Sequence, residues 1–120
     1  MRNTQNLRVV EYAMRLAELT YLATAGFPPT ERFGLVSQMR RAAVSIGSNI
    51  AEGCGRSSAP QMLHFLQIAS GSASELEYQV RLSHRLKFGD AGSLETLRQV
   101  IESERRMLAR LMARIRESAR

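Results

Sequence analysis

The sequence predicts an all-α protein, an antiparallel up-down-up-down four-helix bundle. Glycine and proline cluster at only three places, and these divide the chain into four long segments. Each segment repeats apolar residues at three- and four-residue spacing, and no stretch alternates strictly enough to be a strand. Segments of roughly 22 to 28 residues form helices about 33–42 Å long, and short connections between them favour antiparallel neighbours. We therefore expect residues 1–120 to form a single domain.

The first two predicted helices run from about Thr4 to Ala25 and from about Thr30 to Cys54. Thr30 is expected to be the N-cap of the second helix, and Glu31 suits the positive end of its dipole. In the first helix, the apolar positions at core spacing are Leu7, Val10, Met14, Ala17 and Tyr21. In the second helix they include Phe33, Val36, Ala43, Val44, Ile46 and Ile50.

The third predicted helix begins near Ser58, with Pro60 tolerated in its first turn, and continues to about Lys87. Lys87 near the end and Gly89 just beyond it fit a C-terminal cap. The apolar positions of this helix are Met62, Phe65, Leu66, Ala69, Ala73, Leu76 and Val80. The fourth helix is expected to start at Ser93, and its apolar stripe is Leu94, Leu97, Ile101, Leu108, Leu111 and Ile115.

Two features interrupt the regular pattern. Glu104 stands at a seam position of the fourth helix, between Ile101 and Leu108. Residues 69–74 read ASGSAS, six small residues in succession, which lets another backbone approach closely but lowers helix propensity. We expect tight packing within the chain at this segment. A ligand cleft and a contact with a second chain are the alternatives.

The charge and the cysteine content of the chain exclude several classes of protein. The chain has 17 Lys and Arg against 11 Asp and Glu, a net charge of +6, and residues 91–120 supply half of it. The single cysteine, Cys54, excludes an intramolecular disulfide framework and a cysteine-rich zinc site, and it fits a reducing compartment. The N-terminus lacks the apolar run of a signal peptide, and the longest uncharged stretch, 57–74, is too polar for a membrane helix. We expect a soluble, cytoplasmic protein without membrane association.

No catalytic or metal-binding motif is present in the sequence. His64 and His84 lie twenty residues apart, and neither belongs to a Glu-x-x-His or HExxH motif. Glu75 and Glu77 diverge by about 200° on a helix, so they do not face one another and are expected to pair with arginines of adjacent helices or chains. Cys54 is expected to be a small buried thiol. The sequence therefore predicts no enzyme activity, no metal site and no cofactor.

The basic residues of the predicted fourth helix are more informative. Arg106, Arg110 and Arg114 follow an i, i+4, i+8 row, which Arg98 extends. At about 100° per residue this row lies nearly opposite Leu108, so it should face away from the core. Because arginine can bind phosphate bidentately, we expect Arg106, Arg110 and Arg114 to bind nucleic acid. The alternative is a solvated helix face whose charge is partly neutralised by nearby glutamates.

Polar residues of the second and third predicted helices are expected to have a structural role. Arg40 and Arg41 lie in mid-helix among apolar residues, and further polar residues follow on the same helix. Such groups are predicted to form a buried ion-pair network that fixes helix register. The predicted network consists of Arg40, Arg41, Asn49, Glu52, Glu75 and Glu77.

The central part of the chain resembles a known bacterial family. The run ERFGLVSQMRRAAVSIGSNIAEGCGR, followed by FLQIASGSASELE, is similar to the four-helix-bundle family first named for open reading frames within 23S rRNA intervening sequences. Related proteins are accessory factors of diversity-generating retroelements. The similarity covers residues 31–88, and the flanking helices agree in length and character. The matching residues are Phe33, Gly34, Leu35, Gln38, Arg40, Arg41, Ala42, Ser45, Asn49, Ile50, Ala51, Glu52, Gly53, Arg56, Phe65, Leu66, Ala69, Gly71, Ser72, Glu75, Leu76 and Glu77.

The resemblance implies an antiparallel four-helix bundle that assembles as a homopentameric ring, with no known catalytic activity. In the retroelement branch it implies a basic ring that binds nucleic acid and a reverse transcriptase. Together with the arginine row, it leads us to expect a non-enzymatic oligomer that binds RNA or DNA through a basic surface. The alternative is a protein-interaction scaffold whose charge serves solubility and pairing between subunits.

Overall fold

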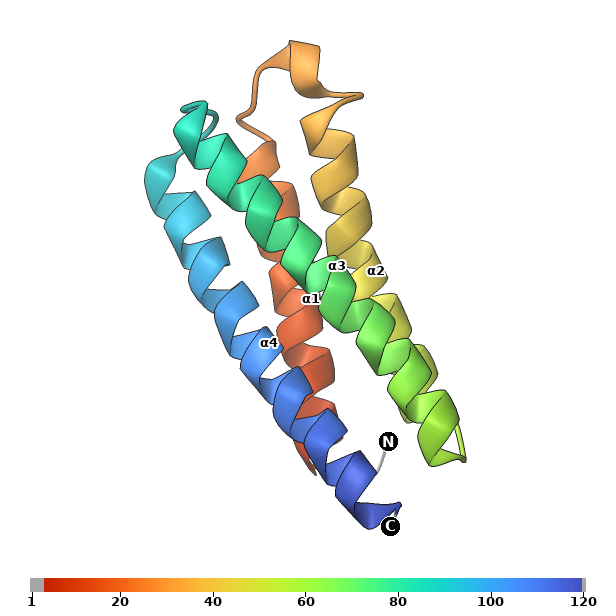
Figure 1. Ribbon diagram of the computed structural model, residues 1–120. Helices are drawn as coiled ribbons and strands as arrows, with labels where there is room; N and C mark the ends of the chain where they lie inside the picture. Colours follow the sequence, from red (N-terminus) through yellow and green to blue (C-terminus); the bar gives the residue numbers. More distant parts are fainter. Residues whose placement is uncertain (1–3, 120) are drawn as a thin grey trace.

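Four long helices, each running opposite to the one before it, make up the computed structural model, which describes residues 4–119 (Figure 1). They are α1 (Thr4–Thr24), α2 (Leu35–Cys54), α3 (Ala59–Arg85) and α4 (Ala91–Ser118), with a short 3-10 helix, η1 (Pro29–Glu31), before α2. Within the described residues, α1 lies beside α2 and α4, and α3 lies beside the same two helices, so α1 and α3 are diagonal to each other, as are α2 and α4. The predicted all-α four-helix bundle is confirmed.

The core between the helices is mainly aliphatic, and small residues let α2 and α3 share the most extensive contact of any helix pair. Ala43 and Ala73 are fully buried. A Cβ placed on Gly53 would lie 3.2 Å from the Met62 carbonyl oxygen, so α3 passes close to the end of α2. The largest fully buried apolar side chains are Leu16, Met39, Ile46, Ile50, Leu66, Leu76, Leu97, Ile101 and Leu108.

The core face predicted for α1 is wrong for its three largest side chains, whereas Val10 and Ala17 pack against the core. Leu7, Met14 and Tyr21 are 49%, 58% and 45% exposed, and Val10 and Ala17 are half-buried. The face that enters the core is instead formed by Val9, Ala13, Leu16, Thr20, Ala23 and Thr24. Small residues pack on this face because α2 comes close to it. A Cβ on Gly47 would lie 3.5 Å from the Ala13 Cβ. The threonine hydroxyls are satisfied within the helix, since Thr20 donates to the Leu16 carbonyl at 2.7 Å and Thr24 donates to that of Thr20 at the same distance.

The second helix also begins later than the sequence predicts. Thr30 is not an N-cap, because it lies within η1, and the N-cap of α2 is Gly34. Glu31 still serves the start of α2, because its Oε1 accepts a hydrogen bond from the Leu35 amide at 3.3 Å. Phe33 precedes the helix and is 87% exposed, and Val44 is exposed on its outer face, so neither belongs to the core. Of the residues predicted to be buried here, the structure confirms Val36, Ala43, Ile46 and Ile50.

The termini of α3 and α4 follow simple capping chemistry. Ser58 accepts from the Gln61 amide at 3.3 Å, and Asp90 accepts from the Ser93 amide at 2.8 Å, which places the start of α4 at Ala91 rather than Ser93. At the end of α3, Lys87 and not Gly89 occupies the left-handed position of the cap, with a φ of 62°. The Phe88 amide donates to the Ser83 carbonyl at 3.0 Å, which completes a Schellman motif.

The small-residue segment 69–74 packs through Ala69, Ala73 and Ser72, whose hydroxyl lies 3.0 Å from the Ser45 hydroxyl of α2. Ala69 and Ala73 are fully buried, whereas Gly71 is exposed and a Cβ added to it would meet nothing within 4 Å. Close helix packing at this segment is therefore confirmed for its inner face, and its outer face is open.

None of the helices between residues 4 and 119 combines the length and apolar character needed to cross a bilayer.

Candidate functional site

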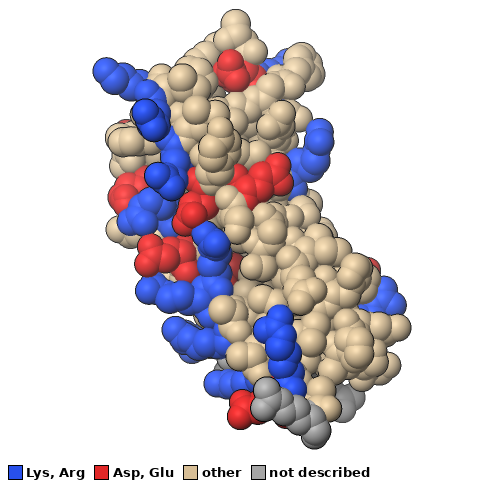
Figure 2. Space-filling model, viewed as in Figure 1, with Lys and Arg blue, Asp and Glu red and all other residues tan. Residues whose placement is uncertain are grey.

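The arginine row of α4 lies on the surface, as its spacing predicts. Arg106, Arg110 and Arg114 are all exposed. Figure 2 shows Lys and Arg side chains gathered along the α4 side of the molecule, with acidic side chains among them mainly around the middle. The row is not straight, because a step of four residues advances about 40° beyond a full turn. Its upper member, Arg98, lines a cavity against α3, whereas Arg106 and Arg110 line a groove against α1.

This groove between α1 and α4 has a volume of about 220 Å³ and brings together residues far apart in the sequence. We call it the arginine groove. From α1 it receives Arg8 and Tyr12, which are one turn apart on the edge that borders α4. The full lining is Arg8, Tyr12, Ser103, Arg106, Met107 and Arg110. Arg8 and Tyr12 were not predicted for this site, because the buried side of α1 differs from the one that its apolar pattern indicates.

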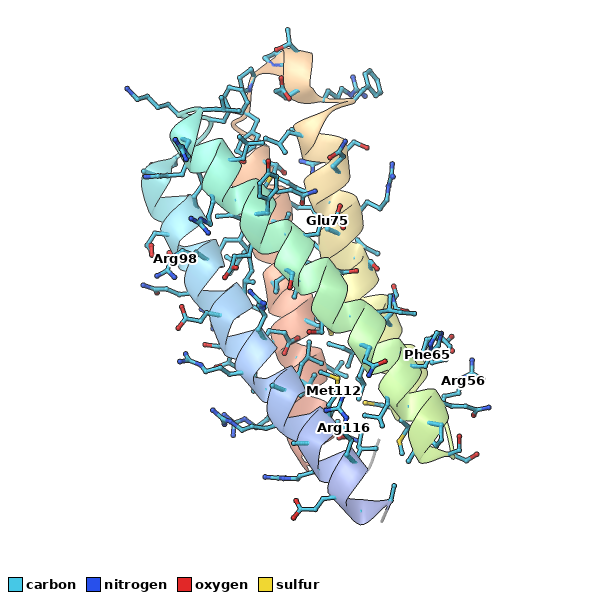
Figure 3. All side chains as sticks on the ribbon, in the orientation of Figure 1. Arg56, Phe65, Glu75, Arg98, Met112 and Arg116 are labelled. Atoms are coloured by element: carbon cyan, nitrogen blue, oxygen red, sulfur yellow. The ribbon has the colours of Figure 1, made fainter. Side chains whose placement is uncertain are left out.

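Ion pairing neutralises the upper part of α4 more than the lower part. Glu102 accepts from Arg98 Nη1 at 3.1 Å and lies 3.4 Å from Arg106 Nη1. Arg98 also bonds Glu95 at 2.6 Å (Figure 3). Within residues 4–119, by contrast, Arg8 and Arg110 have no ion-pair partner, and neither does Arg116 further along α4, so part of the unbalanced positive charge lies at the arginine groove.

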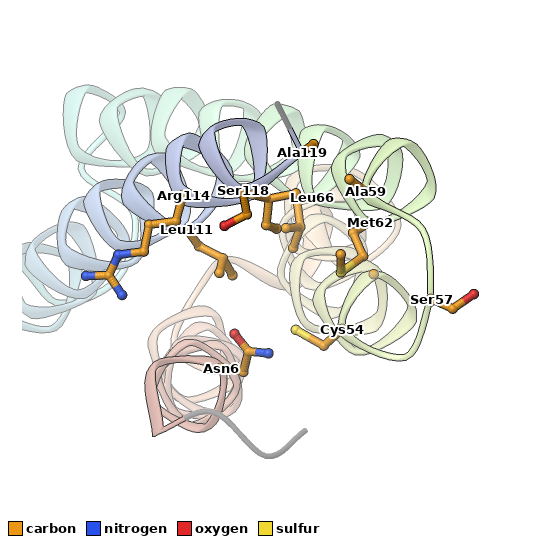
Figure 4. A pocket seen from close by; sticks show the side chains of 12 residues that line it. Asn6, Cys54, Ser57, Ala59, Met62, Leu66, Leu111, Arg114, Ser118 and Ala119 are labelled. Carbon is orange, nitrogen blue, oxygen red and sulfur yellow. The ribbon is translucent and has the colours of Figure 1, made fainter.

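The third predicted site residue, Arg114, lies apart from the arginine groove. It lines a cavity of about 410 Å³ at the end of the bundle where α2 ends and α3 begins. Figure 4 shows that its guanidinium points away from Cys54 and Met62. Among the described residues, the Oδ1 atom of Asn6 is buried beside this cavity without a hydrogen-bond donor. The structure thus groups Arg106 and Arg110 and places Arg114 at a different cavity.

The predicted ion-pair network does not assemble. Arg40 turns toward α1, where its Nε donates to Thr24 Oγ1 at 3.0 Å and its guanidinium carbon lies 4.5 Å from the centre of the Tyr21 ring. Arg41 is exposed. Asn49 bonds the Ser45 carbonyl at 2.8 Å, one turn earlier in its own helix. The mid-helix arginines are thus at the edge of α2 rather than inside the bundle, so they need no buried carboxylates.

The three predicted acidic members of the network have separate partners. Glu52 pairs with Arg56 on the surface at 2.7 Å, and the Arg56 guanidinium also lies over the Phe65 ring (Figure 3). Glu75, which Figure 3 also labels, accepts from Gln79 at 3.3 Å. Glu77 alone links two helices, because it accepts from Arg105 Nη1 at 2.8 Å and so joins α3 to α4.

Candidate catalytic groups are dispersed. His64 and His84 are exposed on α3, and residues 4–119 contain no group of three or more His, Cys, Asp or Glu side chains suited to a metal. Cys54 is half-buried, and burial raises the pKa of its thiol, which disfavours the reactive thiolate. Glu104 is fully buried, and burial raises its pKa from 4.5 to about 8. It lies in the core and lines none of the cavities described above.

Comparisons with known proteins agree with this fold. A model of the family described as 23S rRNA-intervening sequence protein matches residues 5–110. A solved structure of a protein of unknown function from the S23 ribosomal protein family of Bacteroides thetaiotaomicron superposes with a TM-score of 0.82 at 22% identity, over 92% of this chain and 99% of that one. A search of curated proteins finds no match. The chain belongs to the 23S rRNA-intervening sequence protein family.

Proposed function

We propose that the protein is a non-enzymatic oligomer that binds RNA or DNA through the basic side of α4. The observation that carries this proposal is the arginine groove, where Arg106 and Arg110 meet Arg8 of α1 and no carboxylate lines the space between them. Guanidinium groups bind phosphate oxygens bidentately, and most of the affinity of nucleic-acid binding comes from such contacts. Arg114 continues the row beyond the groove on the same helix.

Exposed apolar side chains support self-association. Leu7, Met14 and Tyr21 form a stripe along α1, at a spacing of seven residues, and all three are about half-exposed. Two more large side chains, Ile68 and Tyr78, are exposed on α3, the helix diagonally opposite. Two different faces on opposite sides of one subunit suit a head-to-tail contact, which forms a ring where the rotation between subunits closes. A ring of five subunits, which the family resemblance implies, would carry a net charge of about +30 and attract polyanions strongly.

The salt dependence of binding tests the nucleic-acid proposal. The intact oligomer is expected to bind fluorescent single-stranded RNA and duplex DNA at low salt. Replacing Arg106, Arg110 and Arg114 with Gln should reduce the slope of log K against log salt by about 2.7 on duplex DNA or about 2.1 on single strands, if each arginine contacts one phosphate. A control variant removes the same charge from exposed positions elsewhere: Arg32, Arg41 and Arg85.

Two results would decide against this function. Absence of binding by the wild-type oligomer at low salt would eliminate nucleic-acid binding as the function. An equal loss of affinity in the two triple variants would show that binding depends on net charge and not on these three arginines.

The apolar stripe of α1 favours the second candidate function, a protein-interaction scaffold. That candidate predicts that the protein purifies with a protein partner and with an absorbance ratio free of nucleic acid, and that charge replacement in α1 at Met14 disrupts the assembly.

A further inference from the structure

Four of the five donor side chains that line the arginine groove have no acceptor among residues 4–119. Arg8, Arg106 and Arg110 supply guanidinium groups, and Tyr12 and Ser103 add two hydroxyls. Within residues 4–119, neither hydroxyl makes a hydrogen bond, and only Arg106 has an ion-pair partner, Glu102 at 3.4 Å. Five donor side chains therefore line one small space, and no carboxylate lines it. An anion bound among the three guanidinium groups would offset their mutual repulsion.

The arrangement fits an anion with several acceptor oxygens. Arg106 and Arg110 are one helical turn apart, which places them about 6 Å from each other along α4. Arg8 and Tyr12 are one turn apart on α1, so the groove offers two donors from each wall with Ser103 in addition. A halide would leave most of these donors unused. A phosphate group has enough oxygens to accept from guanidinium groups on both walls at once.

We propose that the arginine groove binds a phosphate group, clamped between Arg8 and Tyr12 of α1 and Arg106 and Arg110 of α4. The phosphate belongs either to a nucleic-acid backbone, in which case this inference rests on the proposed function, or to a free phosphate compound. The α1 residues distinguish this clamp from a simple basic ridge on α4. A ridge would bind polyanions without Arg8 or the Tyr12 hydroxyl, whereas the clamp needs both.

The experiment compares variants of α1 in the full-length oligomer. Arg8→Gln removes one guanidinium, Tyr12→Phe removes only a hydroxyl, and Arg8→Lys keeps the charge but loses the bidentate fork. Arg15→Gln is the matched control, because Arg15 is exposed on the same helix and does not line the groove. Each variant is titrated with a fluorescent single-stranded oligonucleotide by anisotropy and with inorganic pyrophosphate by thermal shift. Circular dichroism checks that the helical content is unchanged.

The clamp predicts a loss of binding affinity whose size differs between the variants. Arg8→Gln should weaken oligonucleotide binding roughly tenfold or more and reduce the salt slope by about 0.7, and Tyr12→Phe should weaken binding between about two- and tenfold. Arg8→Lys should restore part of the affinity. The control Arg15→Gln should change affinity less than about twofold. Pyrophosphate should raise the melting temperature of the wild type and lose this effect in Arg8→Gln.

The outcomes separate the phosphate clamp from the proposed function. If pyrophosphate protection depends on Arg8 but no oligonucleotide binds, the clamp stands with a free phosphate compound as its ligand, and the nucleic-acid function fails. If Arg8→Gln and Tyr12→Phe leave both oligonucleotide binding and pyrophosphate protection unchanged, or if Arg15→Gln lowers both equally, the clamp is wrong and any oligonucleotide binding belongs to α4 alone. Failure of both probes with the wild type overturns both proposals.

Discussion

The buried carboxyl group of Glu104 makes the stability of the bundle depend on pH. Its side chain is fully buried in the middle of α4, and within the described residues neither carboxyl oxygen has a hydrogen-bond donor. Burial raises its pKa from 4.5 to about 8, because the core does not solvate the charged form. We therefore predict that Glu104→Gln, which keeps the shape but cannot ionise, stabilises the protein above about pH 5 and not below pH 4.

The size of the effect follows from proton linkage. Below pH 4.5 the carboxyl is protonated in both the folded and the unfolded chain, and no penalty arises. As the pH rises toward 8, the unfolded chain releases this proton and the folded chain retains it, so the free energy of unfolding falls by about 1.4 kcal/mol per pH unit. The penalty reaches about 3 kcal/mol at pH 7 and levels off near 5 kcal/mol above pH 9.

Urea unfolding followed by circular dichroism measures this penalty. The wild type and Glu104→Gln are compared from pH 4 to pH 9 at one fixed protein concentration, because assembly also adds to apparent stability. The difference between the two curves isolates Glu104 from other titrating groups. Glu117→Gln is the matched control, since Glu117 is an exposed residue of the same helix, and its difference curve should remain within about 0.5 kcal/mol.

One result would refute this reasoning. If the difference between the wild type and Glu104→Gln stays constant from pH 5 to pH 8, the carboxyl does not change its ionisation on folding. A difference that grows toward low pH would show that the folded protein stabilises the charged form, which is the opposite of desolvation.

Three further predictions concern backbone positions, each measured by urea unfolding. Lys87→Gly should stabilise the protein by about 1 kcal/mol, because glycine adopts the left-handed cap position without strain, and Lys87→Ala should not. Gly71→Ala should stabilise by up to about 1 kcal/mol, whereas Gly53→Ala should destabilise, because only at Gly53 would the new methyl group press on α3. Gly89→Ala should cost about 1–3 kcal/mol, since Gly89 has a φ of 70° and its Cβ would lie 2.7 Å from the Phe27 ring.

The sequence predicts α3 and α4 better than α1 and α2. In α3 and α4 the predicted apolar positions coincide with the buried face despite the interruption at Glu104, so periodicity finds both the helix and its buried face. On α1 two stripes compete, and the larger residues Leu7, Met14 and Tyr21 lie on the outer one. Hydropathy alone predicts that the outer stripe is buried. The close approach of α2 instead buries the face that contains Ala13 and Thr20. This choice depends on a neighbouring helix, so the pattern of one helix cannot reveal it.

In the candidate site, too, some features could be predicted from the sequence and others could not. Because the row on α4 is a local property of one helix, the exposure of Arg106 and Arg110 could be predicted from spacing alone. The contribution of Arg8 and Tyr12 could not, because it depends on which edge of α1 lies against α4. The partner of Arg40 could not be predicted either, because its side chain donates a hydrogen bond to Thr24, sixteen residues earlier in the chain.

The extensive contact between α2 and α3 has a consequence for how the bundle opens. These two helices are joined by only four residues, 55–58, and their small buried side chains hold them close together. Local opening starts where less surface is buried, so α1 and α4 should separate from the bundle before this hairpin does. In native-state hydrogen exchange, the amides of Ile46, Ile50 and Leu76 should therefore be among the last to acquire deuterium.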